Sequence, residues 1–108
     1  MNYKGIDMKL QVVSGEDTYR ETLESKGIKT EIIKESIKVA RGIGARVNCS
    51  VYKYVSPNTN ETLYIYEYVE VWDGNAEIGC YVVGTTSDAD LDVFELYDAV
   101  MKELKERK

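Results

Sequence analysis

The chain has 108 residues, 44% of them hydrophobic, and a formal net charge of -5. It is expected to form a single domain over residues 1–108, because two separate cores would each bury too little surface to fold alone. An acidic chain without a basic run is a poor candidate for binding a phosphate backbone, so a nucleic-acid partner is unlikely. Histidine is absent, which removes the commonest general base and the commonest metal ligand. We therefore expect no cofactor and no bound metal.

The sequence also bears on the compartment. Residues 1–10 contain no apolar run of signal-peptide length, and no segment approaches the roughly 20 apolar residues of a membrane span. The two cysteines, Cys49 and Cys80, do not resemble the disulfide framework of a small secreted domain. These features predict a cytoplasmic protein with no membrane partner.

The first third of the chain predicts a strand followed by helical segments. Residues 6–13 alternate between apolar and polar side chains, which is typical of a half-buried strand. Residues 16–28 suit either a short helix, with Tyr19 and Leu23 on one face, or an irregular lid. From Thr30, a plausible N-cap, the spacing predicts a helix with Gly42 and Gly44 as its stop signals. Its apolar side is formed by Ile32, Ile33, Ile37, Ala40 and Ile43.

Three strands and a final helix are predicted after this. The strands cover residues 46–55, 62–72 and 76–84, with a polar loop in the first connection and a tight hairpin signal at residues 73–75. Ser87 marks the expected start of the last helix. Its apolar residues recur every three or four positions, at Leu91, Phe94, Tyr97, Val100, Met101 and Leu104.

Together these elements predict an α+β fold with two layers. The sheet is expected to be mainly antiparallel and four-stranded, in the chain order strand, one or two helices, three strands, helix, with the helices on one face. The three consecutive strands should be neighbours, and the first strand should lie at an edge. Cys49 and Cys80 would then flank the middle strand about 9–10 Å apart. That separation exceeds disulfide reach, so both are predicted to be reduced, buried thiols.

Strand alternation predicts that the two sheet faces differ. One face would be aliphatic, and the other would carry Tyr52, Tyr54, Tyr64, Tyr66, Tyr68, Trp72 and Tyr81. If exposed, such a patch would be a partner-binding or dimer face, since interface cores favour tyrosine and tryptophan. Two other interpretations remain open. Tyrosine simply favours strands. Alternatively, residues 16–28 or the first-strand connection could fold over this face within one chain.

Two charged residues interrupt the aliphatic pattern. Lys53 and Glu67 both have the alternation of the aliphatic face, and the long hairpin could bring them opposite or diagonal to each other. One interpretation is a structural ion pair near a sheet edge. The other is a pair of pocket charges, with Glu67 as an acid or base.

These observations favour a non-enzymatic protein-interaction module, similar in role to an adaptor or an inhibitor. It would bind itself as a homodimer or bind another protein. The first alternative is a small-ligand-binding domain or an enzyme with a pocket between sheet and helices. The second is an acidic nucleic-acid mimic, which rests on the net charge and on the acidic cluster at residues 88–92.

Overall fold

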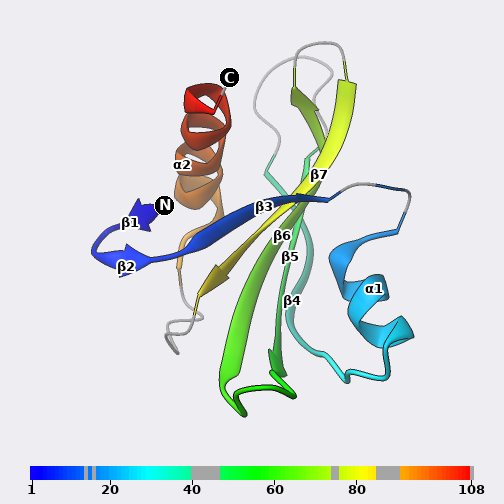
Figure 1. Ribbon diagram of the computed structural model, residues 1–108. Coiled ribbons are helices and arrows are strands. Elements are labelled where there is room, and N and C mark those ends of the chain that lie inside the picture. The colour runs from blue at the N-terminus through cyan, green and yellow to red at the C-terminus, as the bar shows by residue number, and fades with distance from the viewer. Residues whose placement is uncertain (14, 16, 40–46, 74–75, 85–90, 108) are drawn as a thin grey trace.

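The computed structural model describes residues 1–13, 15, 17–39, 47–73, 76–84 and 91–107 (Figure 1). Its main body is a five-stranded antiparallel sheet in the order β3-β7-β6-β5-β4, preceded by a two-stranded hairpin, β1-β2. The strands are β1 (Asn2–Tyr3), β2 (Ile6–Asp7), β3 (Lys9–Val13), β4 (Glu31–Lys38), β5 (Asn48–Val55), β6 (Thr62–Asp73) and β7 (Ala76–Gly84). The helices are α1 (Tyr19–Ser25) and α2 (Val93–Glu106). In the described parts of the chain, neither helix combines the length and apolar character that crossing a membrane requires.

The mixed α+β class and the antiparallel sheet are confirmed, but the predicted placement of both helices on one face is wrong. Figure 1 shows α1 and α2 on opposite sides of the sheet. Helix α2 packs Leu96 and Val100 into a cluster with Val51 and Val82, whereas Leu23 of α1 belongs to a separate cluster. The central strands are apolar on both sides, so each face needs its own cover.

Residues 31–38 form strand β4, so the predicted helix from Thr30 is wrong, and its end at residues 40–43 lies outside the described residues. Two register shifts interrupt the pairing of β4 with β5, one before and one after Lys34. Ile33 and Ile37 pack against the α2 cluster, and Ile32 packs against the α1 cluster. An alternating pattern interrupted by bulges imitates helical spacing, and β-branched isoleucine favours a strand. This extra strand makes the sheet five-stranded rather than four-stranded.

The register between β5 and β6 also differs from the prediction. Val51 pairs with Tyr66 and Tyr52 pairs with Ile65, so tyrosines of β6 share a face with aliphatic residues of β5. The loop at residues 56–61 sets this register, with Ser56 N–H donating to the Glu61 carbonyl over 2.8 Å. A shift of one residue exchanges the faces of a whole strand. The single tyrosine face assumed from the sequence therefore does not form.

A bulge then changes the phase of β6. The pairing with β7 shifts between Tyr68 and Val71, and Glu70 adopts a left-handed conformation with φ of 62°. As a result Val71 joins the same buried cluster as Tyr68. Strand bulges of this kind redirect side chains and often lie beside functional sites.

The N-terminal segment of the chain contacts the C-terminal helix α2. This helix begins later than predicted, at Val93, with Asp92 as its N-cap accepting a 2.9 Å bond from Phe94 N–H. Of the acidic cluster at residues 88–92, residues 88–90 lie outside the described residues. The predicted first strand divides into β2 and β3, and Tyr3 of β1 donates a 3.1 Å hydrogen bond to Glu95 of α2. As predicted, β3 lies at an edge of the sheet.

Both edges of the sheet are obstructed. Just before β3, the N-terminal amino group of Met1 donates to the Met8 carbonyl over 2.8 Å. On β3 itself, the Arg107 guanidinium donates to the Leu10 carbonyl over 3.1 Å. On β4, the two register shifts and the charged side chains of Lys34 and Glu35 disrupt the edge. Such features discourage another strand from pairing there.

The two cysteines lie where the sequence predicts. Cys49 and Cys80 pair with the same residue, Tyr68, from the strands on either side of β6, and both are free and buried. Burial raises the pKa of each thiol to about 12. Both therefore act as small apolar core residues rather than as reactive thiolates.

This placement makes a testable prediction about thiol reactivity. At pH 8, Ellman's reagent should label Cys49 and Cys80 of the native protein only as fast as the fold opens, whereas denatured protein should react at once at both. Unfolding exposes both cysteines and lets them ionise more easily. Their contribution to the free energy of unfolding is therefore complete below about pH 9 and is lost as the pH rises to about 12. Immediate labelling of native protein, or a mass showing a Cys49–Cys80 bridge, would contradict this placement.

Candidate functional site

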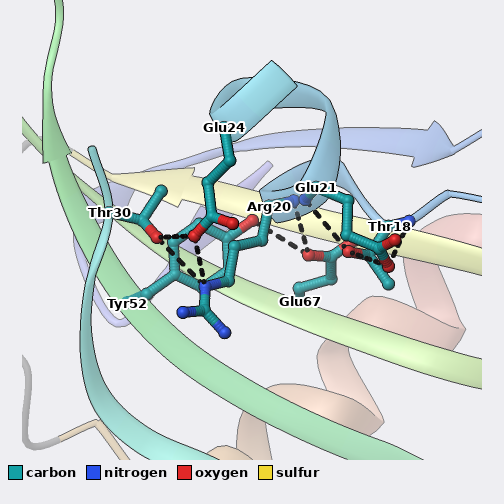
Figure 2. Close-up of polar contacts among 7 residues, drawn as sticks. All are labelled: Thr18, Arg20, Glu21, Glu24, Thr30, Tyr52 and Glu67. Carbon is teal, nitrogen blue, oxygen red and sulfur yellow. Dashed lines mark hydrogen bonds and ion pairs between the residues drawn. The ribbon is translucent and has the colours of Figure 1, made fainter. Parts of the chain in front are cut away.

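The centre of the candidate site is the carboxylate of Glu67, which projects from β6 toward α1 and is only 3% exposed. Its Oε2 accepts a 2.6 Å hydrogen bond from Tyr19 N–H. Its Oε1 accepts a 3.3 Å bond from Arg20 N–H (Figure 2). Tyr52 adds a 2.9 Å hydroxyl bond to Oε1. The first N–H groups of a helix have no intrahelical acceptor and carry partial positive charge. Glu67 therefore satisfies the start of α1 from the sheet.

Local sequence explains why α1 starts where it does. Thr18 is the N-cap, and its hydroxyl accepts a 3.2 Å bond from Glu21 N–H while the Glu21 carboxylate accepts a 3.3 Å bond from Thr18 N–H. This reciprocal capping box needs a threonine followed three residues later by a glutamate. The acceptors at the helix start are thus supplied both by the helix itself and by β6.

A second polar group links α1 to Thr30, the residue that precedes β4. Arg20 Nε donates a 3.0 Å bond to the Thr30 hydroxyl and lies 3.3 Å from Glu24 Oε1. The Thr30 hydroxyl in turn donates a 2.9 Å bond to Glu24 (Figure 2). These three side chains fix the connection between α1 and the sheet edge.

Under α1 lies a layer of aromatic and aliphatic side chains. The rings of Tyr19 and Tyr81 stack with centroids 3.8 Å apart, and the hydroxyls of Tyr19 and Tyr54 lie 3.3 Å apart. Leu23, the buried residue of α1, packs in the same cluster as Tyr52. Burial raises the pKa of Tyr52 and Tyr54 far above the ordinary range, and for Tyr52 the nearby Glu67 charge adds to the effect. Both phenols therefore stay neutral.

A pocket of about 310 Å³ opens beside Glu67, between the start of α1 and strands β3, β6 and β7. Asp17 and Glu70 also line it. Its apolar lining includes Val13 and Val69. Polar groups therefore converge beside aliphatic walls, which is the general character of a ligand pocket. No group of three His, Cys, Asp or Glu residues suited to a metal ion occurs in the described parts of the chain.

The structure separates the seven aromatic residues that the sequence places on one face. Tyr52, Tyr54 and Tyr81 face α1, whereas Tyr64, Tyr66 and Tyr68 face α2, and the Trp72 side chain lies outside the described residues. Tyr68 donates a 2.8 Å hydrogen bond to the carbonyl of Val93. The prediction that these seven residues form one exposed face is therefore wrong. For the α1 side, the alternative that residues 16–28 fold over the tyrosines is confirmed.

Lys53 and Glu67 are also separated, so the predicted pair is wrong. The strand register puts Ser50 opposite Glu67 and Tyr64 opposite Lys53, and the two charged side chains have opposite alternation. Lys53 instead lies 3.6 Å from Glu31 of β4. Each residue does line a pocket, but Lys53 lines a different one, of about 320 Å³.

Sequence reasoning missed the role of α1 in this site. The capping box at Thr18 and Glu21 could have located the helix start from sequence alone. Nothing local connects Glu67 with Tyr19, which is 48 residues away in the chain. Comparison of the chain with protein-family models, with curated proteins and with solved structures finds no match.

Proposed function

We propose that the chain is a non-enzymatic protein-interaction module whose recognition surface is centred on α1. The observation that carries this proposal is the use of the buried Glu67 carboxylate. Its oxygens accept hydrogen bonds from Tyr19 N–H, Arg20 N–H and the Tyr52 hydroxyl. Glu67, the residue best suited to act as a catalytic acid or base, therefore serves to position a helix. A carboxylate held in this way builds a surface rather than activating a substrate.

Charge supports an electropositive partner. Asp17, Glu21 and Glu24 are exposed on or beside α1, and Glu70 is exposed on the adjoining bulge. With a net charge of -5 for the whole chain, this surface would attract a basic protein and accelerate the encounter.

The proposed partner is a different protein rather than a second copy. The sequence argument for a homodimer requires a large exposed face of tyrosines. Tyr52 and Tyr68 are instead 0% exposed within one chain, and both sheet edges are obstructed. Light scattering at about 100 μM should therefore find a monomer, because micromolar self-affinity would fill a dimer at that concentration. A dimer would identify the chain itself as the partner and would contradict this choice.

The test is affinity capture from the source cell followed by binding to the purified partner. Reversing two exposed charges of the surface, Asp17→Lys with Glu70→Lys, should weaken binding about tenfold or more. The matched control is Asp7→Lys with Glu106→Lys, which makes the same change in net charge at two exposed positions outside this surface. If both double variants bind equally, or if no captured protein binds in purified form, the proposal fails.

The pocket beside Glu67 favours a second candidate, a small-ligand-binding domain. Its acidic lining and aliphatic walls suit a compound with an ammonium group on an aliphatic body. Titration with butylammonium, followed by NMR, should move the signals of Val13 and Ile78 if this candidate is right. Those shifts should shrink in the Asp17→Asn, Glu70→Gln variant, and no saturable shift would rule the candidate out.

A further inference from the structure

We infer that the sheet face under α1 is a docking site for an amphipathic helix of a partner, and that α1 occupies this site in the free protein. The inference rests on the proposed function and specifies how the partner binds. The partner's helix takes the place of α1 on the sheet, and the exposed Glu70 of β6 stays beside the site to attract a basic partner. The occupied face consists of Tyr52, Tyr54, Ile65 and Tyr81, which belong to or pack against one cluster. Helix α1 contacts this cluster with Tyr19 and Leu23, which are four residues apart and so share one side of a helix.

The face is built to receive the start of a helix. Glu67 is a buried acceptor at the point where α1 presents two N–H groups without intrahelical partners. The carboxylate is complementary in charge to the positive end of any helix laid in this position. A partner helix with an aromatic residue and a leucine at i and i+4 would repeat the contacts of α1, which is the usual pattern of helix recognition in a groove.

Helix α1 is also the element best able to leave. It has seven residues, which is too short for a stable isolated helix, and Leu23 is the buried residue among them. Gly15 and Gly27 stand before and after it in left-handed conformations, with φ of 102° and 83°. The α2 cluster on the opposite face has its own core, so it can persist while α1 opens.

Binding of a labelled peptide to the full chain tests this. The peptide copies residues 17–29, is acetylated and amidated, and stands in for the partner helix. The apparent affinity is reduced by the fraction of protein in which the face is open. The protein variant Leu23→Ala should therefore bind the peptide about tenfold or more tightly than the wild type. Thr18→Ala, which removes the N-cap, should act in the same direction and serves if Leu23→Ala fails to fold.

Two controls make the test specific. Val100→Ala disturbs the α2 face, where Val100 is 0% exposed, and should leave the peptide affinity unchanged. A peptide with alanine at the position of Leu23 should bind more weakly to every variant. The inference is overturned if neither loosened variant gains affinity, or if hydrogen exchange shows α1 opening only together with the whole sheet. If a captured protein then still needs Asp17 and Glu70 for binding, the proposed function holds and only this docking mode fails.

Discussion

Glu67→Gln is expected to lower the free energy of unfolding by about 2–4 kcal/mol, because one member of a buried, charge-assisted network is changed. Glutamine keeps the size of the side chain but replaces one acceptor oxygen by an NH₂ group. That group would face N–H donors of Tyr19 or Arg20, or the donating Tyr52 hydroxyl. Denaturant unfolding followed by circular dichroism measures the change.

The control and a second variant separate the network from a simple loss of charge. Glu61→Gln, at an exposed loop position, should change the stability by no more than about 0.5 kcal/mol. Tyr52→Phe should cost about 1 kcal/mol in the wild type and a different amount beside Glu67→Gln, since the two groups share a hydrogen bond. If Glu67→Gln costs no more than Glu61→Gln, Glu67 does not hold α1 as described.

Leu96→Ala should cost about 3–5 kcal/mol of unfolding free energy, which is the largest effect expected from one side chain of α2. Leu96 is 0% exposed and packs in the main cluster with strands β3, β5, β6 and β7. Truncation removes buried methyl groups and leaves a cavity that the surrounding sheet cannot close. Thermal or denaturant unfolding of the purified variant gives the value.

The matched control for this variant lies two residues earlier on the same helix. Phe94 is 43% exposed, so Phe94→Ala should cost well under half as much as Leu96→Ala, although it removes a larger side chain. Equal losses from the two variants would mean that α2 does not pack on the sheet through the side containing Leu96.

Much of the fold could be predicted from local pattern. Strand β7 has the predicted bounds of residues 76–84, and β5 and β6 differ from theirs by no more than two residues at an end. Their alternation extends over eight or more residues, which makes the strand signal strong. The sequential meander and the reduced cysteines follow from the same patterns. The composition of residues 16–28 fits a helix or a lid, although the capping box of α1 is a local signal for a helix.

The site could not be predicted, because it depends on contacts between distant segments. Glu67 meets Tyr19 only because α1 crosses β6, and no spacing within either segment encodes that meeting. Alternation alone predicts that Lys53 and Glu67 share a face, but the register of the hairpin separates them. The seven aromatic residues were divided between two faces by the same register.

Composition and alternation by themselves establish an acidic α+β domain with an antiparallel meander and a C-terminal amphipathic helix. Long-range packing decides the rest. It turns residues 31–38 into a bulged edge strand, selects the pairing of Val51 with Tyr66, and places the two helices on opposite faces. The physical reason is that a short apolar run fits a helix or a strand equally well, and a strand with two apolar sides can turn either one inward. Only the burial available when α1 and α2 pack on the five-stranded sheet distinguishes these states.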